Sequence, residues 1–203
     1  MLGSRGISCR TRSLSCAAME PATAAVAEIV CGIAPLDASE QNHIDHTLAW
    51  LASTDDIYRR IKPSTPSPHL VSYIALVDPE QRGIYLGLHR KSGLHLPMGG
   101  HVEPGEHPRT TALREAAEEL GITAELTVIG DRPLMVTSTM TVGDDSHEDM
   151  SLWYVARGDR TRKYRLDPDE FDHGRWWDLD PYGIPESDPH LPRFLTKLQA
   201  ALA

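Results

Sequence analysis

The sequence contains few cysteines, no long apolar run and no excess of positive charge, and each lack excludes a class of protein. Its three cysteines have neither the spacing of a metal site nor the even number of a disulfide framework, which favours a reducing, cytoplasmic location. No apolar stretch approaches the roughly 18 residues of a membrane-spanning helix, so we expect no membrane partner. The formal net charge of −9 argues against binding of a nucleic-acid polymer, but not against a small anion bridged to the protein by Mg²⁺.

The rest of the composition is typical of a globular domain with an N-terminal extension. Hydrophobic residues make up 40% of the 203 residues and charged residues 24%. Residues 1–18 contain three arginines and no acidic residue, as a transit peptide would. We favour a different interpretation, in which Met19 is the true start or the leader is disordered; in either case we expect no chemistry there.

Residues 19–61 are expected to form a helical extension. One helix is predicted over 22–33, and Asp37 and Glu40 have the spacing of a capping box that opens a second. Thr54 is a candidate cap for a short third helix over 55–61. His43 and His46 are expected to be ordinary surface residues. The linker 62–68, with the sequence KPSTPSP, ends the helical part because proline is excluded from helix interiors.

The remaining domain, residues 69–203, alternates strand and helix signals. Runs rich in β-branched and aromatic residues predict strands over 69–77, 84–89, 124–129, 133–141 and 150–156, with a late strand around 175–177 and a terminal helix within 189–202. No internal repeat is evident. The pattern therefore predicts a domain of the α+β class.

The most informative stretch is GGHVEPGEHPRTTALREAAEELGI, residues 99–122. Pro108 suits the first turn of a helix and Gly121 its left-handed end. At 100° per residue an apolar set is predicted on the side facing the core and an acidic set on the opposite side; these are Leu113, Ala116, Ala117 and Leu120, and Glu115, Glu118 and Glu119.

Three carboxylates on adjacent turns repel one another, at about 0.2–0.5 kcal/mol per pair. An ordinary solvated acidic face is the simplest explanation of such a triplet taken alone. A bound Mg²⁺ ion is the alternative, because it takes carboxylate oxygens and keeps positions open for water and phosphates.

The surrounding residues favour the second explanation, because the stretch resembles the Nudix box. The box is a glycine, a glutamate, an Arg-Glu pair, an aliphatic residue, a Glu-Glu pair, a glycine and an aliphatic residue at fixed spacing; the matching positions are Gly100, Glu106, Arg114, Glu115, Ala116, Glu118, Glu119, Gly121 and Ile122. Only Ala116 departs, being smaller than usual.

The resemblance implies an α/β/α sandwich around a mixed sheet, with the N-terminal helices as an addition. It also implies hydrolysis of a diphosphate linkage in a nucleoside diphosphate derivative, with Mg²⁺ or Mn²⁺ as cofactor. By the resemblance, Glu115, Glu118 and Glu119 bind the metal, with the carbonyl of Gly99 as a further ligand. Glu115 is alternatively the general base. Arg114 and Glu106 are expected to support the geometry of the loop and helix.

Relatives of this kind often use a carboxylate outside the box. Glu170 is the first candidate, because it lies in an acidic loop ahead of an aromatic strand. Glu148 and Asp149 are the alternatives, and at most one of them can face the site because successive strand residues point to opposite faces. His147 is a candidate contact to a phosphate or a base.

The sequence leaves the substrate and its binding residues unknown. A catalytic hydrolase is preferred over a Nudix domain that only senses a nucleotide, because all box glutamates are present. An isopentenyl-diphosphate-type isomerase is disfavoured, because Cys31 is the last cysteine and precedes the domain. The N-terminal helices are expected to cover the substrate cleft or to form a homodimer interface.

Overall fold

The computed structural model describes residues 19–62, 64–142 and 145–203, so the leader and Pro63 of the linker lie outside the described residues. Two helices open the described chain, α1 (Pro21–Cys31) and α2 (Ala38–Leu51). The carboxylate of Asp37 caps α2 by accepting hydrogen bonds from the N–H groups of Ser39 and Glu40. The capping box is not closed as predicted, because the Glu40 carboxylate accepts from the N–H of Leu36, at 2.6 Å.

The short helix predicted over 55–61 is wrong. Thr54 caps only a single turn, by accepting from the N–H of Asp56 at 3.0 Å. The carbonyl of Ile57 then accepts from Leu70, and the N–H of Ile61 donates to Thr65. Because these backbone groups bond to the segment that leads into the first strand, a helix cannot use them.

A seven-stranded mixed sheet forms the centre of the domain. Its strands are β1 (His69–Asp78), β2 (Gly83–His89), β3 (His95–Leu96), β4 (Met98–His101), β5 (Met135–Met140), β6 (Glu148–Arg157) and β7 (Phe171–Asp178). The central strand β1 runs parallel to β6 and antiparallel to β2 and β4. Strand β5 pairs with β6, while β3 and β7 pair with β2.

The strand predicted over 124–129 is absent. Leu126 packs into the core on one face of the sheet, whereas Val128 and Ile129 pack against the core of the other face. Because the segment passes from one face of the sheet to the other, its apolar residues pack on both faces although it forms no strand of the sheet.

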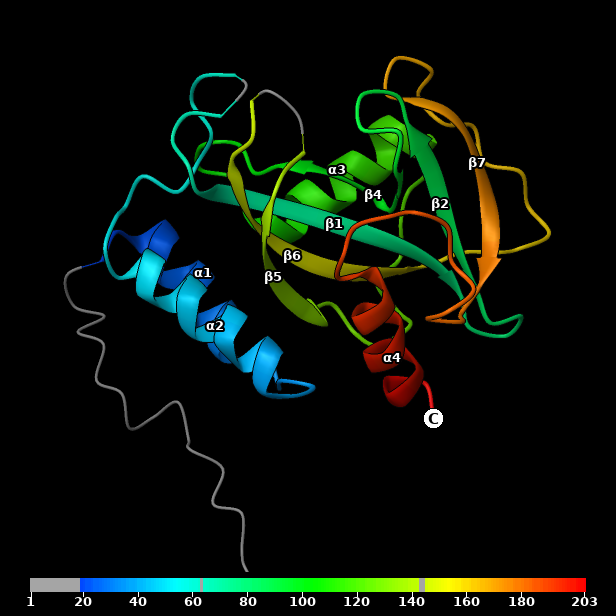
Figure 1. Cartoon of the computed structure of the whole chain (residues 1–203), viewed down its shortest axis with the longest axis horizontal. Helices are drawn as coiled ribbons and strands as arrows, with labels where there is room; N and C mark the ends of the chain where they lie inside the picture. The colour runs from blue at the N-terminus through cyan, green and yellow to red at the C-terminus, as the bar shows by residue number, and fades with distance from the viewer. Residues whose placement is uncertain (1–18, 63, 143–144) are drawn as a thin grey trace, which may run out of the picture.

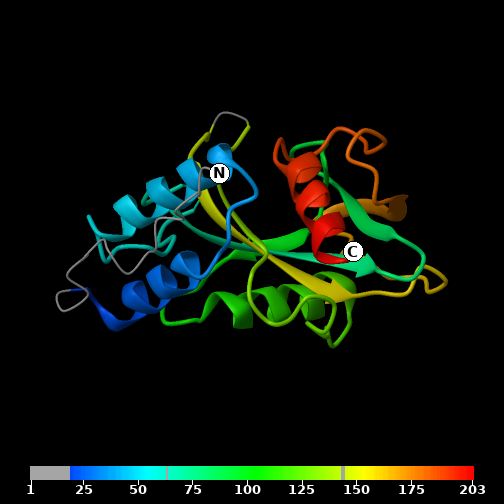
Figure 2. The same cartoon turned by 90° about the horizontal axis from the view of Figure 1, so that it is seen from below.

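Helices cover both faces of the sheet, which confirms the α/β/α sandwich. Figure 2 shows α3 (Pro108–Leu120) on one face and α4 (Leu191–Ala201) on the other. Figure 1 shows α1 and α2 beside the β5 end of the sheet, where α2 contacts β5. Val30 and Leu51 of these helices belong to the same buried core as Ala116 of α3. In the part of the chain that the structure describes, no helix combines the length and hydropathy needed to cross a membrane.

Helix α3 begins and ends as predicted. Pro108 occupies its first turn, and Gly121 ends it with φ of +64° in the left-handed region. The orientation predicted for its acidic side is wrong, because Glu115 and Glu119 are buried with Ala116 whereas Ala117 is exposed. The buried face of α3 therefore includes residues of both the apolar and the acidic set, and two of its carboxylates lie against the sheet.

Candidate functional site

Two glycines in the middle of β4 allow close packing in two directions, Gly99 against β1 and Gly100 against α3. Gly99 has a φ of +156°, and a Cβ atom there would lie 2.5 Å from the carbonyl oxygen of Ser72. A Cβ atom on Gly100 would lie 2.3 Å from Oε1 of Glu115. The absence of a side chain at Gly100 leaves the space that the Glu115 carboxylate occupies.

Arg114 connects the loop before α3 with the carboxylates on the helix. Its guanidinium donates two hydrogen bonds to Glu106, at 3.1 Å each, and single bonds to Glu115 at 2.7 Å and Glu118 at 2.9 Å. A further bond reaches the carbonyl of His101, at 3.3 Å. Although burial opposes the shift, the hydrogen bonds from Arg114 and Thr111 lower the pKa of Glu106. One guanidinium therefore fixes the relative positions of three carboxylates.

Glu119 is the most deeply buried carboxylate of the set. Its Oε2 accepts a hydrogen bond from the N–H of Gly99 at 2.9 Å. Burial raises the pKa of Glu119 to about 10, and hydrogen bonding with Glu170 and the charge of Glu115 act in the same direction. Burial also raises the pKa of Glu115, against the effect of Arg114.

The structure brings Glu170 to this group from a distant part of the chain. The N–H of Asp167 donates to the carbonyl of Glu119 at 2.9 Å, which holds the loop before β7 against the end of α3. The N–H of Arg90 donates to the carbonyl of Glu170, also at 2.9 Å. The carboxyl group of Glu170 then lies within hydrogen-bonding reach of that of Glu119.

The other candidates beyond the box lie elsewhere. Glu148 contacts Nε2 of His46 at 2.8 Å and the hydroxyl of Ser138. Asp149 faces His69 at 3.1 Å and His147 at 3.4 Å. The sequence analysis did not group these side chains, because they come from separate segments.

The side chains of Glu115, Glu118, Glu119 and Glu170, together called the carboxylate group, have the chemistry to bind a divalent cation. Burial and the charge of Glu170 raise the pKa values of Glu115 and Glu119, so the arrangement favours either a bound proton or a cation. Carboxylate and backbone carbonyl oxygens are the donors that Mg²⁺ and Mn²⁺ take in proteins. Glu118, which is exposed, leaves one side of the group open to solvent.

A Gly100→Ala substitution should displace Glu115. The added methyl group would meet the Glu115 carboxylate, and overpacking of this kind costs about 1–3 kcal/mol. We expect urea unfolding to show this loss of stability, together with a fall in turnover. If the cause is the predicted contact, Gly100→Ala should cost less stability in a Glu115→Ala background than in the wild-type chain. An equal cost in both backgrounds would contradict the close approach.

Comparison with known sequences identifies a family profile and relatives that this chain resembles. Residues 66–198 match the profile of the NUDIX domain. An uncharacterized Nudix hydrolase of Rhodococcus erythropolis is 33% identical over 111 residues, which cover 52% of this chain and 56% of that protein. The asymmetrical bis(5'-nucleosyl)-tetraphosphatase of Sus scrofa is 52% identical over 48 residues, covering 22% of this chain and 33% of that protein. The chain thus spans about half, or less, of the length of these curated relatives.

Solved structures share the fold at lower identity. A NUDIX-family hydrolase from Clostridium perfringens superposes with a TM-score of 0.50 at 20% identity, covering 66% of this chain and 98% of that one. A Caenorhabditis elegans Ap4A hydrolase in a binary complex gives a TM-score of 0.50 at 18% identity, covering 66% of this chain and 96% of that one. These likenesses support the fold alone.

Proposed function

This chain belongs to the Nudix family, and from that premise we propose that it hydrolyses a diphosphate linkage in a nucleoside diphosphate derivative with the help of Mg²⁺ or Mn²⁺. The observation that carries the proposal is the convergence of Glu115, Glu119 and Glu170 beside the glycines of β4, with Glu119 buried and the other two carboxyl groups acting on it.

Each residue of the group has a proposed role. Glu115, Glu118 and Glu119 hold the cation, with the carbonyl of Gly99 as a further ligand. Arg114 and Glu106 act as positioning residues, because the guanidinium fixes the carboxylates through the four bonds described above. When bound, the cation would neutralise phosphate charge and promote ionisation of the attacking water.

Glu170 is the proposed additional member of the group, from outside α3. It is exposed, yet its carboxyl group reaches Glu119. It is therefore placed to bind a second cation or to accept a proton from water, while Glu115 remains the other candidate for the general base.

The substrate class is proposed from the family and its named relatives. The match to a bis(5'-nucleosyl)-tetraphosphatase covers only 48 residues, so dinucleoside polyphosphates are one candidate among several. Nothing specific favours a purely sensing role. An isomerase is disfavoured because Cys31, the last cysteine of the sequence, lies in α1, outside the residues that match the family.

A phosphate-release screen tests the proposal. The panel contains nucleoside triphosphates, nucleotide sugars, ADP-ribose and dinucleoside polyphosphates, each with Mg²⁺ or Mn²⁺ and a coupled phosphatase where needed. We expect turnover of at least one class that stops when EDTA is added. Turnover that persists in EDTA, or silence across the panel with metal bound, would contradict the proposed hydrolase.

Glu170→Gln should lower kcat by about 100-fold, the low end of what a positioned acid–base or metal-binding carboxylate contributes. Its exposed neighbour gives the matched control, because Asp169→Asn removes a negative charge from the same loop. Steady-state kinetics on the best substrate of the screen should show a loss only for Glu170→Gln. Equal kcat values for the two variants would show that Glu170 is not part of the site.

A further inference from the structure

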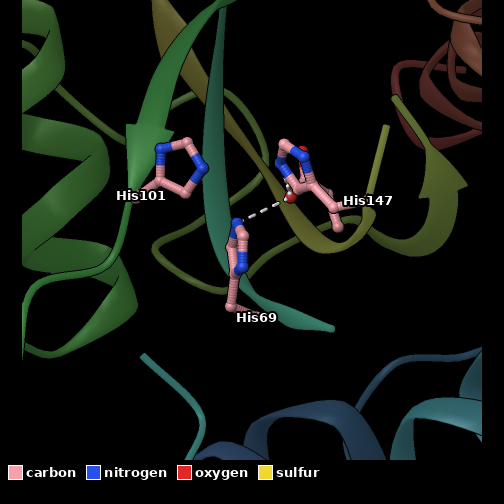
Figure 3. A group of neighbouring side chains, drawn as sticks. His69, His101 and His147 are labelled. Carbon is pink, nitrogen blue, oxygen red and sulfur yellow. Dashed lines mark ion pairs between the residues drawn. The ribbon is translucent and has the colours of Figure 1, made fainter. Parts of the chain in front are cut away.

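A second group of side chains, separate from the carboxylates of α3, lies where β1 and β6 begin and β4 ends. We call it the histidine cluster; its members are His69, His101, His147 and Asp149. One donor atom from each lies within 4.8 Å of the others. Figure 3 shows the three imidazoles directed toward a common centre. Oδ1 of Asp149 lies near Nε2 of both His69 and His147.

The register of the sheet explains why the cluster forms. His69 of β1 is paired with Asp149 of β6 in the parallel ladder, so both side chains point to the same face. His101 of β4 is paired with Val71, two residues after His69, and shares that face. His147 precedes Asp149 by two residues, which brings it to the same side.

The cluster contains four buried polar atoms without hydrogen bonds. They are the Nε2 atoms of the three histidines and Oδ1 of Asp149. Nε2 of His69 lies 3.1 Å from Oδ1 of Asp149, and Nε2 of His147 lies 3.4 Å from it, but neither contact is a hydrogen bond. Buried polar atoms are nearly always satisfied, so four unsatisfied atoms that face one another need an explanation.

Contacts on the outer side of two rings indicate which nitrogen carries the hydrogen. Nδ1 of His69 lies 2.6 Å from the carbonyl of Pro66, and Nδ1 of His147 lies 2.7 Å from the carbonyl of Asp145. A carbonyl can only accept, so in each ring Nδ1 is the donor. In the neutral tautomers Nε2 then presents a lone pair to the centre, and such carbonyl contacts are typical of metal-binding histidines.

We propose that the histidine cluster binds one Zn²⁺ ion. Three imidazole nitrogens and one carboxylate oxygen match the four-coordinate N/O sites of zinc, whereas Mg²⁺ and Ca²⁺ take oxygen ligands. Zinc–nitrogen distances of about 2.0–2.1 Å place tetrahedral ligands about 3.3 Å apart. The two contacts to Asp149 already have this spacing, and the remaining pairs need to close by at most about 1.5 Å from their 4.8 Å limit.

The bound ion would join three separate segments of the chain. His69 begins β1, Asp149 is the second residue of β6, and His101 ends β4 next to Gly100. The carbonyl of His101 accepts a hydrogen bond from Arg114, which also bonds to Glu115 and Glu118. An ion bound to the His101 ring would therefore also restrain the position of Arg114. The cluster shares no residue with the carboxylate group and does not depend on the proposed hydrolysis.

Metal analysis of the purified full chain tests the proposal. The chain is expressed with added zinc, passed through gel filtration in buffer with excess Mg²⁺, and measured by inductively coupled plasma mass spectrometry. We expect about one zinc per chain, as a closed four-ligand site holds its ion through purification. After removal of zinc with dipicolinate, added Co²⁺ should give the visible absorption of a tetrahedral site.

Variants separate the cluster from other metal sites. His147→Asn should lose most of the zinc, whereas His173→Asn, an exposed histidine in β7, should keep it. Glu119→Gln should also keep it. A zinc-free wild-type chain that takes up no Co²⁺ would overturn the proposal. So would wild-type zinc content in His147→Asn, or loss of the zinc in Glu119→Gln; circular dichroism checks that the variants are folded, and the Co²⁺ result does not depend on them.

Discussion

Glu119→Gln should lower kcat by about 1,000-fold or more while leaving the fold intact. Removal of a metal ligand from a hydrolase site forfeits several kcal/mol of transition-state stabilisation, and each 1.4 kcal/mol is worth tenfold in rate. The amide oxygen of glutamine still accepts the hydrogen bond from Gly99, so the N–H group of this β4 residue keeps its partner.

The stability of the same variant should change in the opposite direction. Because burial and the neighbouring carboxyl groups raise its pKa to about 10, Glu119 must take up a proton when the chain folds at neutral pH, and glutamine removes that cost without changing the shape of the side chain. In metal-free buffer at neutral pH the melting temperature should therefore equal or exceed that of the wild type. Glu125→Gln, an exposed carboxylate just after α3, is the matched control for both measurements. Wild-type turnover in Glu119→Gln would contradict the proposed metal site.

Lys197→Met should destabilise the protein by about 3–5 kcal/mol, the usual cost of breaking a buried ion pair from one side. Lys197 of α4 pairs with Glu40 of α2, whose side chain is only 2% exposed. Burial lowers the pKa of Lys197, which shows how little solvent reaches the pair. Without the lysine, the N–H of Leu36 is the remaining hydrogen bond to a buried carboxylate.

Two further variants test this explanation by urea denaturation. The double variant Glu40→Met/Lys197→Met should recover most of the lost stability, because an apolar pair of similar size costs no unpaired charge. Arg157→Met breaks an exposed pair with Glu80 and should cost less than about 1 kcal/mol. An equal, small cost for Lys197→Met and Arg157→Met would show that the Glu40 pair contributes nothing to the contact between α2 and α4.

The sequence was sufficient where the signal is local. Pro108 and Gly121 defined the ends of α3 because each has a backbone preference that suits its position. The long strands β1 and β6 were found because most of their residues are apolar, β-branched or aromatic. The fixed spacing of the box residues gave the family.

The errors arose where distant segments compete for backbone groups or for burial. The helix predicted over 55–61 gave way to bonds with Thr65 and Leu70. The buried face of α3 was misplaced because apolar residues were taken as the only markers of burial, whereas Glu119 is 3% exposed. The spacing of apolar residues along a helix cannot predict that the fold buries a carboxylate.

The histidine cluster was missed because its ligands have no common spacing. Its only local signal was the i, i+2 pair of His147 and Asp149, which places both side chains on one face of a strand. His69 and His101 join them through the pairing of β1 with β6 and β4. In contrast, Glu170, the first candidate for a carboxylate outside the box, does lie close to Glu119. The role of Glu170 is a proposal.

Cation binding by the carboxylate group is the central claim, and a Mn²⁺ titration followed by electron paramagnetic resonance tests it most directly. The free Mn²⁺ signal is recorded for zinc-loaded wild-type protein, for Glu119→Gln and for Glu125→Gln under the same conditions. We expect wild type and Glu125→Gln to remove Mn²⁺ from solution and Glu119→Gln to leave most of it free. Equal binding by all three proteins would show that the carboxylates of α3 do not hold the cation.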